Sequence, residues 1–220
     1  MVPSKAPRQY KRTEPPSLYL EKELNQTGYL NIAGVDEVGR GALAGPVVAA
    51  AVILPLDATF TWFKLVRDSK EVSPTKRNEL YSLISAQATA TAVGIIEPHV
   101  IDSIGIFNAT KLAMLQAVKQ FTYPPDFLLI DALTLPHLHI EQKGIIKGDK
   151  LCLSIACASI IAKVTRDRIM EELDIIHPGY SLSKHKGYCT RQHCTCLQQL
   201  GPSPIHRQSF APVRETSLLL

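Results

Sequence analysis

The chain of 220 residues carries 24 Lys and Arg against 20 Asp and Glu, a formal net charge of +4. With 45% hydrophobic and 20% charged residues, its composition is typical of a globular domain and argues against disorder. A domain of this length buries enough surface to fold without disulfide or metal staples. The mildly basic charge permits a polyanionic partner without requiring one.

Basic residues gather in two stretches that contain no acid. Residues 177–214 lack Asp and Glu but include Lys184, Lys186 and Arg191, and the first twelve residues are equally free of acids. Such single-sign stretches suit contacts with phosphates, although a merely solvated surface is the alternative interpretation.

The sequence gives no sign of membrane insertion or secretion. The longest uncharged apolar stretch, residues 42–56, is interrupted by Pro46 and Pro55 and is shorter than the roughly 20 residues that a membrane-spanning helix needs. The basic start has no apolar signal segment after it. Five cysteines, an odd number, indicate reduced thiols, so we expect a cytoplasmic protein without membrane contact.

Strands and helices alternate along the chain. We interpret residues 1–28 as an N-terminal arm with a short helix at 17–26, and residues 29–220 as one domain. Short apolar runs predict strands at 31–36, 47–54, 90–96, 127–131 and 139–146. Helical spacing predicts a helix starting at Ser73-Pro74, one capped by Asn108, one at 154–176 and one at 190–200. This alternation indicates an α/β domain.

Carboxylates occur at the ends of apolar runs that are expected to be buried in the core. Asp36 and Glu37 follow one apolar run, and Asp131 follows another. If these strands end at the same edge of a sheet, the charges repel unless a cation lies among them. Oxygen ligands without neighbouring thiolates favour Mg²⁺ or Mn²⁺. A helix cap or salt bridge explains any single acid, but explains less well three acids with Asp149 as a fourth.

The acid pair is followed by a glycine-rich segment, Gly39-Arg40-Gly41, that ends at Gly45. Glycines let a backbone approach a ligand closely. A dinucleotide-binding loop would have to open a helix, whereas Gly45 precedes an apparent strand, so we disfavour that alternative.

Together these motifs resemble bacterial ribonuclease HII, the type 2 ribonuclease H. The resemblance covers roughly residues 30–215. The matching segments, in order, are 35–41 with 45–48, 68–70, 129–131, 147–149, 158–167, 185–188 and 207–210.

The resemblance implies a ribonuclease H-like fold, with a mixed five-stranded sheet flanked by helices and a helical C-terminal part. It also implies two Mg²⁺ or Mn²⁺ ions and an endonuclease that cleaves RNA in RNA–DNA hybrids. Single ribonucleotides embedded in duplex DNA would be cut on their 5′ side. By motif, the catalytic and metal-binding acids are Asp36, Glu37, Asp131 and Asp149.

Substrate contacts follow from the same resemblance. The Gly39-Arg40-Gly41 segment would sense the 2′-hydroxyl that distinguishes RNA from DNA, largely through its backbone. Tyr188 would stack on the sugar beside the junction. Lys70, Lys184 and Lys186 are candidates for phosphate contacts, which position a duplex without reading its sequence.

Other interpretations stay open. The histidines and cysteines between His185 and Cys196 could suggest zinc, but the Cys194–Cys196 spacing is too tight for paired zinc ligands. A non-catalytic duplex-binding protein is the alternative function, disfavoured because metal-free carboxylates repel phosphate. We expect a monomer, and a sliding-clamp partner is left open.

Overall fold

The computed structural model describes residues 15–217. The basic cluster of Lys5, Arg8, Lys11 and Arg12, and half of the predicted N-terminal arm, lie outside this range.

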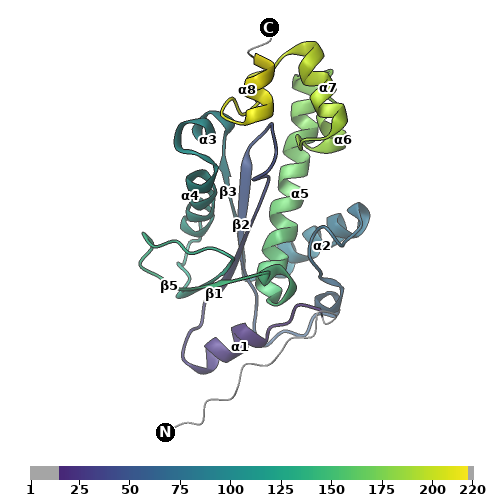
Figure 1. The fold of residues 1–220 in the computed structure, drawn as a ribbon. Helices are drawn as coiled ribbons and strands as arrows, with labels where there is room; N and C mark the ends of the chain where they lie inside the picture. Colours follow the sequence, from purple (N-terminus) through teal and green to yellow (C-terminus); the bar gives the residue numbers. More distant parts are fainter. Residues whose placement is uncertain (1–14, 218–220) are drawn as a thin grey trace.

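Five strands form one mixed sheet, in the order β3-β2-β1-β4-β5 (Figure 1). The strands are β1 (Ile32–Val38), β2 (Val47–Ile53), β3 (Ala90–Ile96), β4 (Phe127–Asp131) and β5 (Glu141–Ile145). β2 pairs with β1 and with β3 in antiparallel orientation, whereas β4 lies parallel to β1 and to β5. The predicted mixed sheet is confirmed, with the fifth strand shorter than the predicted 139–146.

Helices cover both faces of this sheet (Figure 1). α5 runs along one face with α2 beside it, and α4 covers the other face together with α3. The helices are α1 (Tyr19–Gln26), α2 (Pro74–Gln87), α3 (Pro98–Ile104), α4 (Ile106–Lys119), α5 (Leu153–Ile176), α6 (Leu182–His185), α7 (Arg191–Leu200) and α8 (Ala211–Ser217). Two short 3₁₀ helices, η1 (Thr61–Leu65) and η2 (Gly148–Lys150), complete the set.

The interior strand β2 explains why both faces of the sheet need a cover. Every residue of β2 is buried, and its side chains alternate between two hydrophobic clusters. Val48, Ala50 and Val52 pack towards α5 and α2, whereas Val47 and Ala49 pack towards α4. A strand buried on both faces is uniformly apolar, and β2 has such a sequence.

Gly34 in β1 allows α5 to lie directly on the sheet. A Cβ atom at this position would come within 2.2 Å of the backbone carbon of Ser154. Any larger residue would therefore push the helix away from the strand. Because β1 carries Asp36 and Glu37, this close packing also fixes α5 relative to those acids.

Residues 15–28 pack against the rest of the fold. Ser17 forms an isolated β-bridge with Cys152. The buried carboxylate of Glu21 in α1 accepts hydrogen bonds from the backbone N–H and the hydroxyl of Ser154, at 2.9 and 2.7 Å. Glu21 thus caps the start of α5, and the proposed division of the chain at residue 28 stays a prediction.

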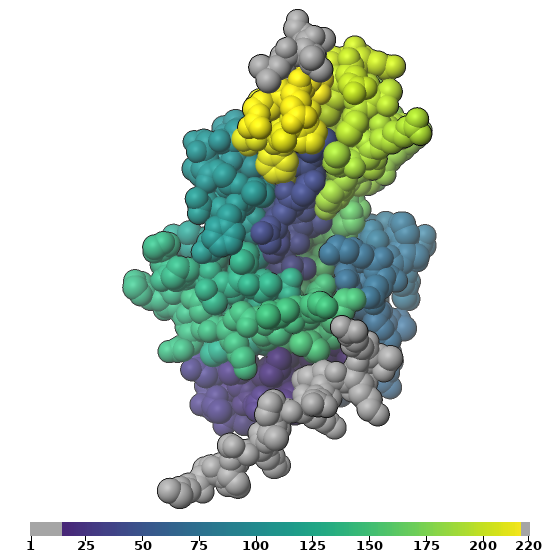
Figure 2. Space-filling view, in the orientation of Figure 1, coloured from purple at the N-terminus to yellow at the C-terminus, as the bar shows by residue number. Residues whose placement is uncertain are grey.

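A small helical cluster completes the C-terminal end. α6, α7 and α8 gather there around buried Tyr180, Leu182, Leu197 and Val213. Figure 2 shows this cluster at one end of the molecule and α1 at the opposite end. The expected helical C-terminal part is confirmed.

Three local predictions were wrong or incomplete. Asn108 does not cap a helix, because α4 already begins at Ile106 after Gly105, and the Asn108 amide donates to the carbonyl of Ile104 instead. Pro98 both ends β3 and opens α3, which the sequence did not predict. α6 and α8 were not predicted either, because α6 has only four residues and α8 is only two turns long, so each gives a weak periodic signal.

Candidate active site

Neighbouring parallel strands deliver the acids to one edge of the sheet. β1 pairs with β4 in a register that places Val35 opposite Ile130. Asp36 and Asp131 follow these residues, so both strands bring a carboxylate to the same edge. Asp149 comes from η2, which follows β5, and the backbone N–H of Gly148 in η2 donates to Asp131 Oδ1 at 2.7 Å.

All four predicted acids line one pocket of about 370 Å³. Its other polar walls are Ser69, Lys70, Ser159, Lys163 and Tyr188. Asp36 is buried, with 5% of its surface exposed, whereas Asp131 and Asp149 are half-buried. The structure therefore brings together residues that are more than 110 positions apart in the chain.

Burial raises the pKa of every one of these acids, and the charge of a nearby carboxylate adds to each rise. Burial is the largest cause for Asp36, followed by the charge of Glu37, and the pKa of Asp36 lies well above its usual value. Burial raises the pKa of Glu37 although Arg40 lowers it. For Asp149, burial and then the charges of Asp68 and Asp131 raise the pKa to about 6. The site stores unfavourable negative charge that a cation would relieve.

Glu37 has a carboxylate oxygen with no partner. Its Oε1 atom accepts a hydrogen bond from Arg40 at 3.3 Å, whereas Oε2 is buried without any hydrogen bond. A buried unsatisfied carboxylate oxygen is rare and costly. Within residues 15–217, however, no three acidic, histidine or cysteine side chains already converge on one metal position. The acids thus share a pocket without forming a closed set of ligands.

Two buried arginines hold the glycine-rich segment in place. Arg166 in α5 donates to the carbonyls of Pro46, Ala44 and Lys186, at 2.8–3.0 Å. Arg207 donates to the carbonyls of Gly45 and Arg40. Both arginine side chains are fully buried. Their hydrogen bonds go to backbone carbonyl oxygens rather than to carboxylates. Both arginines lie in segments that match the family, but no role was predicted for either of them from the sequence.

The two predicted substrate-sensing glycines differ in whether the structure has room for a side chain at their position. Gly39 has φ of +91°, and a Cβ atom there would meet the Arg166 side chain at 2.2 Å. Gly41 is exposed, and a Cβ atom there would meet nothing within 4 Å. Packing therefore explains Gly39 but not Gly41. In place of the helix that a dinucleotide loop requires, β2 follows Gly45, which rules out that alternative.

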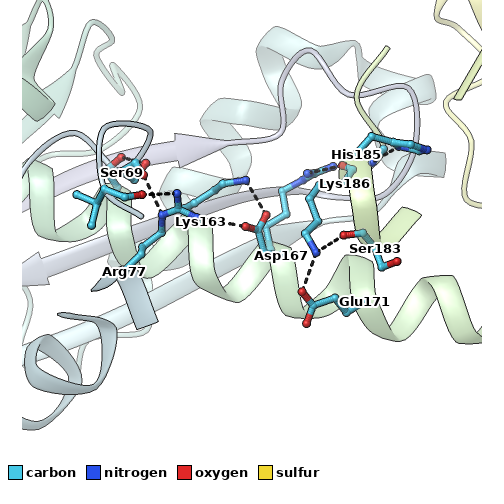
Figure 3. A network of polar contacts seen from close by, with 12 residues as sticks. Ser69, Arg77, Lys163, Asp167, Glu171, Ser183, His185 and Lys186 are labelled. Carbon is cyan, nitrogen blue, oxygen red and sulfur yellow. Dashed lines mark hydrogen bonds and ion pairs between the residues drawn. The ribbon is translucent and has the colours of Figure 1, made fainter. Parts of the chain in front are cut away.

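The basic candidates occupy different environments. Lys70 and Tyr188 line the pocket, and Arg40 is exposed beside Glu37. Lys184 is exposed on α6, outside the pocket lining. Lys186 is held by Glu171 and by the carbonyl of Ser183, both at 2.7 Å, as Figure 3 shows. Its ammonium group is already engaged on the helix side.

A polar network that the sequence analysis missed runs along α5 beside the pocket (Figure 3). Asp167 lies between Lys163 and Arg77, with Oδ1 2.7 Å from the Lys163 ammonium and Oδ2 3.6 Å from Arg77. Arg77 also donates to the carbonyl of Ser69, whose hydroxyl lies 2.9 Å from that of Ser159. Lys163 brings a positive charge to the pocket, and burial lowers its pKa while Asp167 opposes that shift.

Asp68 is a fifth acid near the pocket that the sequence analysis did not assign. It is 8% exposed, accepts the backbone N–H of Lys70 at 3.0 Å and lies 3.8 Å from the Lys150 ammonium. Its place in the Asp68-Ser69-Lys70 motif was the available signal.

A histidine pair supports the backbone of Tyr188. Nδ1 of His206 lies 3.0 Å from the backbone nitrogen of Ser203 and 3.3 Å from its carbonyl oxygen, which leaves Nε2 of His206 facing His193. That nitrogen lies 3.0 Å from Nε2 of His193, and Nδ1 of His193 lies 3.1 Å from the carbonyl of Tyr188. These contacts connect α7 and its following loop to the carbonyl of Tyr188.

A sequence model of the family described as ribonuclease HII matches residues 33–213, most of the chain. The chain belongs to the ribonuclease HII family.

Relatives within the ribonuclease HII family are close. The chain is 55% identical over 199 residues to ribonuclease HII of Dehalococcoides mccartyi, covering 90% of this chain and 94% of that protein. It is 56% identical over 195 residues to ribonuclease HII of Desulfitobacterium hafniense, covering 89% and 74%.

Solved structures share the fold. Ribonuclease H2 from Pyrococcus horikoshii superposes with a TM-score of 0.73 at 23% identity, over 86% of this chain and 98% of that chain. The ribonuclease H-like fold predicted from the sequence is confirmed. Among the residues that the structure describes, none of the helices is long and apolar enough to cross a membrane.

Proposed function

We propose that this ribonuclease HII family member is a metal-dependent endoribonuclease. It hydrolyses the phosphodiester bond on the 5′ side of ribonucleotides, in RNA–DNA hybrids and at single ribonucleotides within duplex DNA. The observation that carries the proposal is the pocket shared by Asp36, Glu37, Asp131 and Asp149, whose mutual repulsion calls for cations.

The donor set fits hard divalent ions. Four carboxylates without a thiolate or imidazole in the pocket lining are the ligands that Mg²⁺ and Mn²⁺ prefer. The unpartnered Oε2 atom of Glu37 is one oxygen available for such an ion. A structural neighbour, ribonuclease HIII, is described in complex with Mn²⁺; it has a TM-score of 0.64 and 18% identity over 89% of this chain and 71% of that chain.

Two such ions, when bound, supply a hydroxide nucleophile at neutral pH and neutralise charge on the leaving oxygen. Asp36, Glu37, Asp131 and Asp149 would hold them. The remaining work of the protein is to position the strand. Lys70 and Lys163, which line the pocket, supply positive charge for the backbone phosphates.

Recognition of the ribose falls to the glycine-rich segment and Tyr188. Gly41 leaves open space where a side chain would otherwise stand, which supports close approach of a ribose to its backbone. The Tyr188 ring lines the same pocket and offers a flat face to a sugar or base. Because only RNA has a 2′-hydroxyl, a contact at this position discriminates RNA from DNA.

The decisive experiment uses a DNA duplex that contains one ribonucleotide. The protein is incubated with it in Mn²⁺, in Mg²⁺ and in EDTA, and the products are mapped at nucleotide resolution. We expect incision directly 5′ of the ribonucleotide, only with metal, and none by Asp36→Asn. Tight salt-sensitive binding without incision would instead favour the non-catalytic duplex-binding alternative.

The proposal extends to a partner. One neighbour, from Archaeoglobus fulgidus, is described as a complex of PCNA with RNase HII, with a TM-score of 0.68 and 23% identity over 83% of this chain and 96% of that chain. On that basis the proposal includes binding of this chain to a sliding clamp. The protein itself is proposed to be a monomer. Co-elution of the purified protein with a sliding clamp in size-exclusion chromatography tests the partner.

A further inference from the structure

Two thiols lie against each other directly after Tyr188. The Sγ atoms of Cys189 and Cys194 are 3.6 Å apart, and both cysteines are free. Cys189 precedes Thr190, the N-cap of α7, and Cys194 lies in the first turn of that helix. Side chains at these two positions commonly pack together and fix the entry of the chain into a helix. Here both positions hold a group that can form a covalent bond.

The other three cysteines have different surroundings. Cys152 and Cys157 are buried, and burial raises the pKa of each thiol well above its ordinary value. Cys196 is two residues beyond Cys194 on α7, and residues two apart on a helix do not face each other. Cys189 is exposed and Cys194 is partly exposed, so solvent reagents can reach the pair.

We propose that Cys189 and Cys194 are a redox site, which forms a reversible internal disulfide by exchange with a small-molecule disulfide such as oxidised glutathione. The exposed Cys189 loses its proton and attacks one sulfur of the reagent, which releases one glutathione thiolate. Cys194 then loses its proton and attacks Sγ of Cys189, which releases the second thiolate. Each thiolate takes up a proton, so the pair gives two electrons to the reagent and yields two molecules of glutathione.

The bond would act on Tyr188. The backbone N–H of Tyr188 donates to the carbonyl of His185, and its own carbonyl accepts from Thr190 and faces His193. A disulfide requires a sulfur separation of about 2.05 Å, so the two sulfurs must approach by roughly 1.5 Å. Rotation of the two cysteine side chains supplies part of that movement, and the disulfide geometry then constrains residues 188–190 and the first turn of α7, both of which hold Tyr188.

The effect on catalysis rests on the proposed function, whereas the disulfide itself does not. Because the Tyr188 ring lines the acidic pocket, a shift of its backbone should weaken substrate binding. The four acids belong to other elements and keep their positions. We therefore expect oxidation to raise KM for the ribonucleotide-containing duplex by about threefold or more, with kcat changed by less than about twofold.

The chemical test is mass spectrometry of the intact full-length protein. Reduced protein is treated with oxidised glutathione, and the remaining thiols are alkylated. We expect a form that carries two alkyl groups fewer than the reduced, alkylated protein and has no glutathione adduct, and dithiothreitol added before alkylation should restore both alkyl groups. Cleavage by trypsin after Lys186, Arg191 and Arg207 would place the two cysteines in separate peptides, 187–191 and 192–207. A disulfide-linked pair of these peptides shows that Cys189 is joined to Cys194 or to Cys196, both of which lie in peptide 192–207.

Matched variants separate this pair from the other thiols. Cys196→Ala should form the same linked peptides as the parent protein, whereas Cys189→Ser and Cys194→Ser should not. Stable glutathione adducts alone, or disulfide-linked dimers on a non-reducing gel, would overturn the proposal.

Kinetics of the parent protein, reduced and oxidised, test the link to Tyr188, with Cys189→Ser as the control that should not respond. An unchanged KM in protein shown to carry the disulfide would overturn that link. A reduced protein that cleaves no ribonucleotide-containing duplex would instead refute the proposed function, and the linked peptides alone would then decide the redox site.

Discussion

At the scale of single residues, charge explains more than packing does. Asp36 is 5% exposed and stands beside Glu37, and its pKa is raised by burial and then by that neighbour. Evolution of a stable core alone would favour a neutral side chain here, since unpaired buried charge is costly. The acids therefore lower the stability of the metal-free fold, and their presence is explained by a function.

Replacing Asp36 by Asn tests this balance. In the parent protein the backbone N–H of Glu37 donates to Asp36 Oδ1 at 2.8 Å. Asn keeps an oxygen that can accept this hydrogen bond but removes the negative charge. We expect cleavage of the ribonucleotide-containing duplex to fall by about 10²-fold or more, because charge stabilisation at the reacting phosphate is lost. In EDTA the Tm should stay equal or rise.

The matched control for that variant is Asp57→Asn, at an exposed position in the loop after β2. It should change neither activity nor Tm. A Tm of Asp36→Asn that falls by several degrees in EDTA would show that Asp36 holds the fold together.

Alanine substitutions at the two glycines next to the acids should have opposite effects on stability and on substrate binding. Gly41→Ala should leave the Tm unchanged, because its Cβ atom meets nothing within 4 Å, yet should raise KM for the duplex by blocking approach to the backbone. Gly39→Ala should lower stability by about 1–3 kcal/mol, because φ is +91° and the new Cβ atom meets Arg166. Thermal melts and steady-state kinetics on both variants check this. Full activity of Gly41→Ala would remove the glycine from ribose recognition.

At the scale of elements, the C-terminal helices serve the site by holding loops. Arg166 from α5 and Arg207 from the segment after α7 bind backbone carbonyls of residues 40–46. The histidine pair on α7 and its following loop supports the carbonyl of Tyr188 in the same way. The helical C-terminal part thus positions both proposed ribose-sensing segments without contributing an acid.

The histidine pair gives the fold a pH dependence of predictable sign. Burial, and then the neighbouring His193, lower the pKa of His206 to about 4. In the unfolded chain its pKa is near 6.5, so between these values the unfolded state binds the proton more readily. The contribution of His206 is complete above pH 6.5 and is lost as the pH falls towards 4, by up to about 3 kcal/mol.

Denaturant melts between pH 4 and 8 measure that slope. We expect His206→Gln to flatten it, because Gln has no proton to gain in this range. The buried acids shift stability in the opposite direction with pH, so only the difference between variant and parent is informative. His99→Gln, at an exposed position on α3, is the control and should keep the parent slope. Equal slopes in all three proteins would contradict the prediction.

At the scale of the whole molecule, the sheet order decides where the chemistry lies. β1 is central, and β4 joins it in parallel although almost 90 residues separate the two strands in the chain. Parallel neighbours end at the same edge, so Asp36 and Asp131 meet there. α5 then crosses the same face and adds Ser159 and Lys163 to the pocket.

This arrangement predicts that divalent ions stabilise the whole fold. An ion that binds only the folded state at 100 times its Kd adds about 2.7 kcal/mol of stability. For a chain of this size, that raises the Tm by roughly 5–10 °C relative to EDTA. Thermal melts in Mn²⁺ and in Mg²⁺ measure the shift, and Asp131→Asn should reduce it. A Tm of the parent protein that does not respond to millimolar Mn²⁺ would contradict a metal site at the acids.

How far prediction from sequence succeeds depends on whether a signal is local. The strands β2, β3 and β4 follow from apolar runs bounded by proline or acid, and α5 follows from its helical periodicity. Asp36, Glu37 and Asp131 are visible because a carboxylate at the end of an apolar strand conflicts with its surroundings, whereas Asp149, in η2, was assigned from its motif. These features depend on near neighbours in the chain, so the sequence by itself determined them.

Contacts between distant residues were decided only by the tertiary structure. Nothing local shows that Arg166 and Arg207 are fully buried and hold residues 40–46, or that Asp167 bridges Lys163 and Arg77. The structure also places Glu171 2.7 Å from the Lys186 ammonium, while the phosphate contact of Lys186 stays a prediction. A charged side chain can interact with water, with a ligand or with another group of the protein. Which partner it has depends on how distant elements pack together, and the local sequence does not encode that packing.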